Sequence, residues 1–467
     1  MSVDTNNAAF QDALNLIQYT RQSVFLTGKA GTGKSTFLRY VCENTKKKHV
    51  VLAPTGIAAI NAGGSTMHSF FKLPFYPLLP DDPNLSLQRG RIHEFFKYTK
   101  PHRKLLEQIE LVIIDEISMV RADIIDAIDR ILRVYSHNLR EPFGGKQLLL
   151  VGDVFQLEPV VKNDEREILN RFYPTPYFFS ARVFGQIDLV SIELQKVYRQ
   201  TDPVFVGVLD HIRNNTAGAA DLQLLNTRYG SQIEESEADM YITLATRRDT
   251  VDSINEKKLA ELPGDPITFE GVIEGDFPES SLPTSQELVL KPGAQIIFIK
   301  NDFDRRWVNG TIGVIAGIDE EEETIYVITA DGKECDVKRE SWRNIRYRYN
   351  EKTKVIEEEV LGSFTQYPIR LAWAITVHKS QGLTFSRVVI DFTGGVFAGG
   401  QAYVALSRCT SLDGIQLKKP INRADVFVRP EIVNFAGRFN DRQAIDKALK
   451  QAQADVQYAA ASRAFDK

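Results

Sequence analysis

The segment Gly28–Ser35, which reads GKAGTGKS, constrains the fold more than any other part of the chain. It matches the phosphate-loop pattern G-x-x-x-x-G-K-[ST] at every position. An apolar run, Val24–Thr27, precedes it and a helical pattern, Ser35–Cys42, follows it. In this context backbone N–H groups and a helix N-terminus face the phosphates. We therefore predict that Lys34 reaches the β- and γ-phosphates of a nucleotide and that Ser35 binds Mg²⁺.

A second apolar run, Leu111–Glu116, ends in two acids. Buried strands seldom end in paired carboxylates without a cation nearby, because an unpaired buried carboxylate is costly. We expect Asp115 to hold Mg²⁺, mostly through water, and Glu116 to orient and polarise the attacking water. The loop and the acids together predict a phosphate-loop NTPase, a class that includes kinases, GTPases and many ATPases.

Short apolar runs alternate with helical stretches in two parts of the chain. The predicted strands are Val24–Thr27, Val50–Ala53, Leu111–Asp115 and Leu148–Gly152 in the first part, and Leu189–Leu194, Tyr241–Ala245, Val388–Phe392 and Ile415–Leu417 in the second. Alternation of this kind predicts an α/β fold with parallel sheets that are covered on both faces. Ligands bind such sheets at the carboxyl ends of the strands.

Two segments break the alternation. Residues 249–363 are β-rich and carry turn signals, which predicts a small β-barrel inserted into the second α/β domain, with a hairpin formed by Arg346–Tyr349 and Val355–Val360. Gly64–Pro101 has no clear period and is predicted to project from the first domain. The predicted domains are 1–186, with the projection at about 64–101, then 187–248 with 364–420, the insert at 249–363, and a helical tail at 421–467.

The composition of the chain indicates the compartment in which the protein works, but it does not identify the molecule that the protein binds. The net charge of −4 does not indicate a nucleic-acid partner, so any nucleic-acid surface is a local basic path. Candidates for that path are Lys46–Lys48 and Arg305-Arg306. Such basic runs are, however, commonly solvated loops. The three cysteines have no disulfide or zinc spacing. No apolar run approaches the roughly 20 residues that span a bilayer. A soluble, intracellular protein is expected.

Later motifs place polar residues where a second domain would meet the nucleotide. Gln156 follows the strand at Leu148–Gly152, where an amide can hydrogen-bond a γ-phosphate. Arg199 and Arg408 lie in the second α/β region. An arginine supplied across a cleft stabilises transition-state charge and couples hydrolysis to cleft closure. Taken singly, such arginines are more often surface salt bridges.

In this order the motifs resemble those of superfamily-one helicases that move 5′ to 3′, alongside RecD-like and Dda-like motors, and most closely Pif-type helicases and their small bacterial members. The segments that carry the resemblance are Gly28–Ser35, Ala53–Ala59, Gly64–Phe71, Asp115–Val120, Gly152–Pro159, Val197–Gln200, Val377–Thr384 and Ala402–Arg408. Asp126–Leu148 resembles the Pif signature segment, the most specific marker in the chain.

The resemblance implies two RecA-like domains with parallel sheets, a projecting wedge subdomain and an inserted SH3-like β-barrel. It implies an ATP-dependent 5′-to-3′ DNA helicase that translocates on single-stranded DNA and unwinds duplex, and in relatives also G-quadruplexes and DNA–RNA hybrids. ATP and Mg²⁺ are the implied cofactors. Single-stranded DNA and its junctions with duplex are the implied partners of a monomer in the bacterial cytoplasm, at the nucleoid.

The resemblance also assigns roles to residues. The catalytic residues it implies are Lys34, Asp115, Glu116, Gln156, Arg199 and Arg408. The nucleotide contacts it implies are Gln11 (for adenine), Gly28, Ala30, Gly31, Thr32, Gly33, Lys34, Ser35, Thr36, Gln156, Gly382 and Arg408, with Ser35 and Asp115 on the metal. The DNA contacts it implies are Thr55, Gly56, Thr66, His68, Phe70, Phe71, Asn301, Arg305, Asn309, His378 and Lys379.

Aromatic residues near the first set of DNA contacts allow two interpretations. Phe70, Phe71, Phe75 and Tyr76 are placed to stack on bases or split a duplex, and stacking contributes about 1–3 kcal/mol per base whatever the sequence. Paired phenylalanines such as Phe70 and Phe71 are as often core residues. His68 and His378 lack partners at metal-ligand spacing, so we do not expect them to bind metal.

One position departs from the family pattern: Glu158 stands where these helicases often have a second proline. Two other functional classes also remain open. A phosphate-loop ATPase that switches without translocating would explain Lys34, Asp115 and Glu116, but not the later arginines or the His378–Gly382 element. A passive DNA-binding module with a dead nucleotide site is disfavoured by the intact lysine and acids.

Overall fold

The computed structural model describes residues 4, 7–87, 91–198, 202–231 and 240–451. Its first domain is built on a six-stranded sheet in the order β3-β2-β4-β5-β1-β6, with every neighbouring pair parallel. The strands are β1 (Val24–Gly28), β2 (His49–Ala53), β3 (Ser65–Thr66), β4 (Leu111–Ile114), β5 (Gln147–Val151) and β6 (Val190–Leu194). Their almost continuous burial is the pattern of a sheet covered on both faces.

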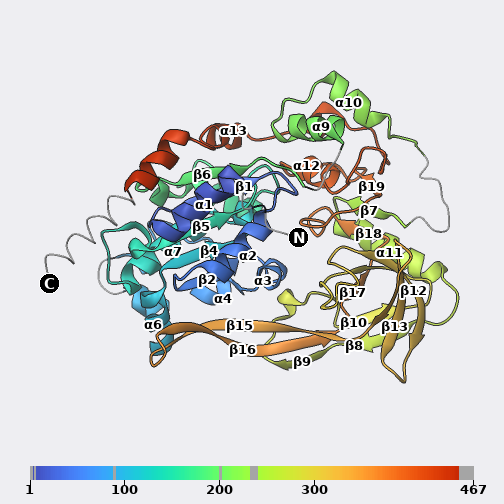
Figure 1. The fold of residues 1–467 in the computed structure, drawn as a ribbon, viewed down its shortest axis with the longest axis horizontal. Coiled ribbons are helices and arrows are strands. Elements are labelled where there is room, and N and C mark those ends of the chain that lie inside the picture. The colour runs from blue at the N-terminus through green and yellow to red at the C-terminus, as the bar shows by residue number, and fades with distance from the viewer. Residues whose placement is uncertain (1–3, 5–6, 88–90, 199–201, 232–239, 452–467) are drawn as a thin grey trace.

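Helices cover both faces of this sheet (Figure 1). On one face, α1 (Ala8–Tyr19) and α2 (Lys34–Asn44) bury Phe10, Leu16 and Phe37 against the strands. On the other face α7 (Ala122–Tyr135) is buried along most of its length. Short helices also join this domain: α3 (Gly56–Ala62), α4 (Met67–Phe71), α5 (Arg91–Phe95), α6 (Lys100–Gln108) and α8 (Asn163–Leu169).

The second domain has a smaller parallel sheet in the order β18-β7-β19-β20. Its strands are β7 (Ile242–Ala245), β18 (Ala374–Thr376), β19 (Val388–Asp391) and β20 (Ile415–Leu417). Its helices are α9 (Pro203–Arg213), α10 (Ala219–Asn226), α11 (Arg248–Glu261) and α12 (Gln401–Leu406). The prediction of an α/β protein with two parallel-sheet domains is confirmed.

One predicted strand lies in the other sheet. Leu189–Leu194 was expected to open the second domain at residue 187, but β6 pairs with β1 in register Val24↔Val190 and forms the edge of the first sheet. Apolar composition reports that a strand is buried and carries no information about which of two parallel sheets receives it. The first domain therefore extends through β6.

The insert is antiparallel. One sheet has five strands, β11 (Gln295–Phe298), β12 (Ile312–Asp319), β13 (Thr324–Thr329), β14 (Glu334–Val337) and β17 (Ile369–Leu371). Smaller sheets join β8 (Ile267–Glu270) to β10 (Glu287–Leu290), and β9 (Val272–Gly275) to a long hairpin of β15 (Glu340–Asn350) and β16 (Val355–Gln366). The hairpin runs back to the first domain, where the Tyr347 hydroxyl donates to the Val51 carbonyl oxygen at 3.5 Å (Figure 1).

The segment predicted to project is partly core. Most of its large apolar side chains, including Met67, Leu78 and Phe96, are buried in the first domain. Three side chains are exceptions, since Phe75 is 84% exposed, Tyr76 51% and Leu87 37%.

The Pif-like signature segment is a buried polar scaffold. Asp126 on α7 accepts hydrogen bonds from the Tyr173 hydroxyl at 2.9 Å and from the backbone N–H groups of Arg182 and Val183 at 3.0 Å each. Asp129 accepts from Arg133 and from the Phe143 N–H. Buried carboxylates are tolerated when they are satisfied in this way, and here they fix the loops that follow α7.

Candidate nucleotide and nucleic-acid site

The phosphate loop connects β1 to α2 as predicted. Gly33 has φ +93°, a conformation that side chains disfavour, and it brings α2 to its first turn directly after the loop. The Lys34 ammonium group donates to the carbonyl oxygens of Gly28 at 2.6 Å and Lys29 at 3.1 Å. Lys34 therefore folds over its own loop, where phosphate oxygens would be the alternative acceptors.

The two acids lie at the carboxyl end of β4. Asp115 accepts a hydrogen bond from the Glu116 backbone N–H at 2.9 Å, and Glu116 has a left-handed backbone with φ +51°. Burial raises the pKa of Asp115, against the opposing effects of that N–H and of Lys34. Burial and then the charge of Asp115 raise the pKa of Glu116, while Lys34 and Arg408 act to lower it. The charge of Arg408, from the second domain, thus acts on Glu116 of the first domain.

A glutamine from the second domain contacts two of the predicted catalytic residues of the first. The Gln381 side-chain amide donates to Glu116 at 3.1 Å and to Gln156 at 2.9 Å. Gln156 is 7% exposed and lies in the turn after β5. Glu116 and the turn that holds Gln156 are therefore bridged across the domain boundary by one side chain.

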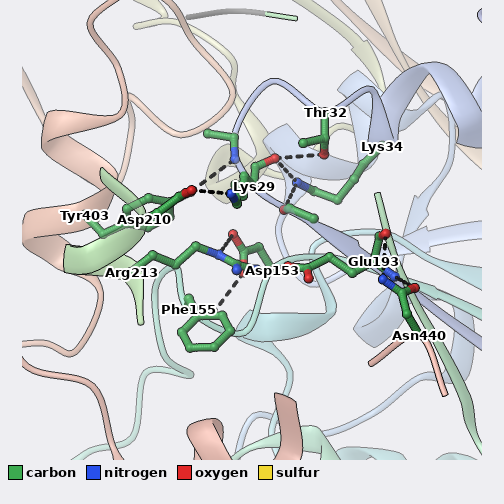
Figure 2. A network of polar contacts seen from close by, with 12 residues as sticks. Lys29, Thr32, Lys34, Asp153, Phe155, Glu193, Asp210, Arg213, Tyr403 and Asn440 are labelled. Atoms are coloured by element: carbon green, nitrogen blue, oxygen red, sulfur yellow. Dashed lines mark hydrogen bonds and ion pairs between the residues drawn. The ribbon is translucent and has the colours of Figure 1, made fainter. Parts of the chain in front are cut away.

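Helix α9 of the second domain also reaches the first domain (Figure 2). Arg213 pairs with Asp153 at 3.1 Å and with Glu193 at 2.9 Å, and its guanidinium lies 4.2 Å from the centre of the Phe155 ring. Burial disfavours the Arg213 charge, but Asp153, Tyr403 and Glu193 outweigh that effect and raise the pKa of Arg213. This buried pair joins α9 to the turn that holds Gln156.

The phosphate loop itself is contacted from the second domain. One turn before Arg213, Asp210 pairs with Lys29 at 2.5 Å, and the Tyr403 hydroxyl accepts the Ala30 backbone N–H at 3.2 Å (Figure 2). Backbone N–H groups of such loops are phosphate donors. The Ala30 N–H is thus directed at an oxygen of the opposite domain in this arrangement.

Of the two predicted cleft arginines, only Arg408 lies in the described part of the chain; Arg199 falls outside it. Arg408 follows α12 and is 1% exposed. Its guanidinium donates to the carbonyl oxygens of Val404 at 2.9 Å and of Ser380 and Leu383 at 3.3 Å. These bonds hold it within its own domain, so a contact with a γ-phosphate requires movement of the side chain or closure of the domains.

A cavity of about 530 Å³ lies where the start of α1 meets the end of β6, lined by Asp4, Asn7, Ala8, Ala9, Glu193, Gln195, Lys196 and Asn440. Gln11, predicted to read adenine, does not line it and lies in the next turn of α1.

The other predicted nucleotide contacts lie in the phosphate loop or close to it in the chain. Ser35 and Thr36 lie in the first turn of α2, Thr32 is a buried residue of the loop, and Gly382 follows Gln381. Gly31 accepts a hydrogen bond from the Tyr198 N–H at 2.9 Å.

The predicted DNA contacts fall at the carboxyl ends of strands in both sheets. Thr55 follows β2 and Thr66 ends β3, and each hydroxyl accepts a backbone N–H as the N-cap of a helix. His378 and Lys379 follow β18 of the second sheet. Two groups of candidate contacts therefore occupy equivalent edges of the two domains.

Each domain carries a histidine stacked on an exposed phenylalanine. In the first, the rings of His68 and Phe75 are 5.0 Å apart at 9°, and in the second those of His378 and Phe397 are 6.5 Å apart at 19°. Phe75 is 84% and Phe397 60% exposed. Burial is the first cause that lowers the pKa of both histidines.

The prediction that Phe70 and Phe71 contact DNA is wrong for this structure. They are 3% and 0% exposed and pack in the core of the first domain. Their positions on the short helix α4 turn both rings inward, and a ring without solvent contact has no face to offer a base. Phe75 is the exposed aromatic side chain next to His68.

The insert meets the DNA candidates of the first domain. A Cβ added at Gly56 would come within 2.6 Å of the Ser281 Cβ, so the insert covers this point. Elsewhere in the insert, the Asn301 side chain accepts the Asn309 N–H at 2.8 Å, and Arg305 is exposed in a left-handed conformation with φ +61°. Asn301, Arg305 and Asn309 thus share one loop.

Several residues that meet at this site were not predicted from the sequence. They are Asp153, Glu193, Asp210, Arg213, Gln381, Phe397, Tyr403 and Asn440. Gln381 and Tyr403 lie inside motif segments, which was an available signal. Arg213 and Asp210 carry no motif, and only their helical spacing of three residues indicates a shared face.

Two features are absent from the residues that the structure describes. No helix there is long and apolar enough to cross a membrane. No group of three or more histidine, cysteine, aspartate or glutamate side chains is arranged to hold a metal ion.

Comparison with known proteins gives consistent matches. The model of the PIF1-like helicase family matches residues 4–212. ATP-dependent DNA helicase Pif1 of Campylobacter jejuni is 33% identical over 412 residues, 85% of this chain and 88% of that protein. Bacteroides Pif1 in complex with ADP-AlF4 is 41% identical with a TM-score of 0.85, covering 94% of this chain and 97% of that one. The same protein bound to ssDNA, with the same coverage, gives 0.65.

Proposed function

The chain belongs to the PIF1-like helicases and is an ATP-dependent DNA helicase; from this premise we propose that it moves 5′ to 3′ along single-stranded DNA and opens duplex at the junction. The direction of movement rests on the family resemblance. The observation that carries the coupling of ATP hydrolysis to movement is the Gln381 side chain, which bridges Glu116 and Gln156 across the domain boundary. A nucleotide that binds between these groups changes the spacing of the domains, and that change is what a motor uses.

The nucleotide chemistry we propose follows from the first domain. Phosphate oxygens replace the acceptors that Lys34 and the Ala30 N–H now contact. Glu116 orients and polarises the attacking water, and Gln156 hydrogen-bonds the γ-phosphate. Arg408, whose field already reaches Glu116, stabilises the transition-state charge once the domains close. Arg199 keeps the parallel role that the resemblance gives it.

We propose that Mg²⁺ binds with the nucleotide at Ser35 and Asp115. A hydroxyl and a carboxylate are the hard oxygen donors that Mg²⁺ prefers, and the buried Asp115 has a raised pKa that a bound cation would lower. The ion would neutralise phosphate charge. Ser35, on the first turn of α2, and Asp115, at the end of β4, orient it from two neighbouring elements.

The nucleotide base is proposed to occupy the cavity at the end of β6, the strand that pairs with β1 before the phosphate loop. Its volume of about 530 Å³ is within the range of small-molecule sites. Asn7 and Gln195 supply amides on its wall, and Tyr198 offers an aromatic face beside Gly33. Gln11 remains a predicted adenine contact from the next turn of α1.

The DNA strand is proposed to cross the carboxyl edges of both sheets. Thr55, Thr66 and His68 would hold it on the first domain, and His378 and Lys379 on the second, by phosphate contacts that do not read sequence. Phe75 and Phe397 would stack on bases. Opening and closing the cleft would then move one grip relative to the other, with Phe75 and Tyr76 leading into the duplex.

Further properties are proposed on the resemblance alone. These are action on G-quadruplexes and DNA–RNA hybrids, work as a monomer, and a place at the bacterial nucleoid. A solved structure that is 40% identical to this chain is described as two coordinating Pif1 helicases that unwind forked duplex DNA, which makes the oligomeric state on a fork a direct question for this chain.

Polarity is tested with two partial duplexes that share one duplex and differ only in the overhang. We expect the 5′-overhang substrate to be opened with ATP and the 3′-overhang substrate to stay closed. Opening of the 3′ substrate alone would contradict the proposed direction. ATP hydrolysis that single-stranded DNA does not stimulate would favour a switching ATPase, and unwinding that survives Lys34→Ala would remove the proposed mechanism.

A further inference from the structure

The chain returns to the first domain after its last strand in the second. Residues 429–449, which we call the strap, follow β20 and include α13 (Pro430–Ala436). Ile432 packs in the core on one face of the first sheet and Ile445 in the core on the other face. The Phe435 ring stacks on Phe179 at 4.3 Å. The strap therefore wraps around the edge of the sheet and forms a second connection between the domains (Figure 1).

The strap crosses the sheet edge at Asn440. The Asn440 side-chain oxygen accepts the Glu193 N–H at 2.8 Å, its side-chain nitrogen donates to the Glu193 carbonyl oxygen at 3.2 Å, and its own N–H donates to the Ser191 carbonyl oxygen at 2.9 Å. An edge strand leaves such groups unpaired, and here β6 is completed by one residue of the strap. Asn440 has φ +54°, a conformation that asparagine tolerates.

Asn440 is also a wall of the cavity assigned to the nucleotide base. Glu193, its partner on β6, lines the same cavity and pairs with Arg213 of α9 at 2.9 Å. Arg213 in turn pairs with Asp153. Figure 2 shows Glu193 of β6 together with Asn440 of the strap and Arg213 of the second domain.

The strap begins at the turn that holds Gln156. Arg429 donates to Glu158 at 2.8 Å, and the Tyr177 hydroxyl donates to the same carboxylate oxygen at 3.0 Å. Glu158 is the residue that stands where related helicases often have a second proline. Proline offers no side-chain acceptor, so the departure from the family pattern supplies this strap with its anchor.

We propose that the strap positions both ends of the nucleotide: Asn440 fixes the wall around the base, and the Arg429–Glu158 pair fixes the turn that presents Gln156 to the γ-phosphate. The inference rests on the proposed ATP site. It makes Asn440 and Arg429 positioning residues with different kinetic signatures. Loss of the Asn440 contacts affects nucleotide binding, and loss of the Arg429 anchor affects turnover.

The first test is Asn440→Gly, which retains the left-handed backbone and removes both side-chain hydrogen bonds. We expect KM for ATP and the Kd for a fluorescent ADP analogue to rise by about five- to tenfold, with kcat on saturating single-stranded DNA within about twofold. Asn440→Asp keeps one acceptor for the Glu193 N–H and gives a second measurement if the glycine variant does not fold. We expect it to lie between wild type and Asn440→Gly.

The second test is Arg429→Gln, for which we expect kcat to fall by about five- to tenfold and KM to stay within about twofold. Arg429→Lys keeps the charge and should recover most of that loss. Arg438→Gln changes an exposed residue of the same strap and should match wild type.

The inference would be overturned if both Asn440 variants had the KM and Kd of the wild-type protein. It would also be overturned if they had a lowered melting temperature with unchanged kinetics, because the strap would then only stabilise the fold. Failure of the wild-type protein to hydrolyse ATP in response to DNA would instead overturn the proposed function, so the two failures are distinguishable.

Discussion

The two parallel-sheet domains differ in what they contribute to one site. The first supplies a complete phosphate loop, both acids and Gln156, all at the carboxyl ends of neighbouring strands. The second contributes single side chains that reach across, namely Gln381, Tyr403, Arg213 and Asp210. In the proposed mechanism one domain holds the nucleotide and the other senses it. On the DNA side they are alike, because each has one histidine–phenylalanine stack.

The largest expected effect comes from the sensing domain. Arg408→Ala should lower kcat by about 10³-fold or more, because an arginine supplied across a cleft acts mainly in the transition state. The Kd for ATP should change little. DNA-stimulated ATPase kinetics and nucleotide titration measure the two quantities, and a melting curve controls for the loss of a buried side chain. Near-normal turnover would remove Arg408 from this role.

The matching change in the holding domain is Lys34→Ala. It should lower kcat by about 10²–10³-fold and weaken nucleotide binding as well, since Lys34 faces phosphates before and during reaction. Affinity for single-stranded DNA, measured by fluorescence anisotropy, should remain within about twofold, because the strand contacts lie elsewhere. If Lys34→Ala and Arg408→Ala lost kcat equally and neither lost nucleotide affinity, the distinction between a holding domain and a sensing domain would be contradicted.

Gln381→Ala removes the bridge between the domains. We expect DNA-stimulated kcat to fall by about 10–100-fold, because two hydrogen bonds are lost, one of them to the Glu116 carboxyl. Hydrolysis without DNA should fall less, and steady-state assays with and without DNA give that ratio. Gln416→Ala, on the outer strand β20 of the same sheet, is the matched control. A uniform loss in both assays would show that Gln381 supports the site without coupling it.

The likeness of the two DNA edges is tested by Phe75→Ala and Phe397→Ala. Each should weaken binding to single-stranded DNA by at least about fivefold, the lower end of one lost stacking contact. Tyr229→Ala removes another exposed aromatic ring of the second domain and should leave Kd unchanged. A loss in only one of the two phenylalanine variants would show that the domains grip the strand by different chemistry.

The smallest expected effect is that of pH. Burial lowers the pKa of His68 and His378, which favours their neutral forms, so both should be uncharged above about pH 6.5. The Kd for single-stranded DNA should therefore be flat between about pH 7 and 8 and should tighten only below, as protonation adds positive charge. A progressive tightening from pH 8 to 7 would mean that at least one imidazole titrates in that range.

Much of the first domain could be predicted because its signals are local. Val24–Ser35 encodes a strand, a glycine loop and a helix in consecutive residues, and Asp115 and Glu116 are fixed by the strand before them. The same reasoning misplaced Leu189–Leu194, since β6 is assigned to its sheet by contacts with β1 across more than a hundred residues. Phe70 and Phe71 were misjudged because a five-residue helix presents either face equally well in sequence.

By itself the sequence determined two parallel-sheet domains and the chemistry of a phosphate loop with its acids, because periodicity and motif spacing act between near neighbours in the chain. Only the tertiary structure decided which second-domain side chains reach that loop and where residues 429–449 attach. Contacts such as Arg213–Asp153 and Asn440–Glu193 join segments far apart in sequence. Single arginines and asparagines are common on any surface, so their partners are set by the packing of the whole chain.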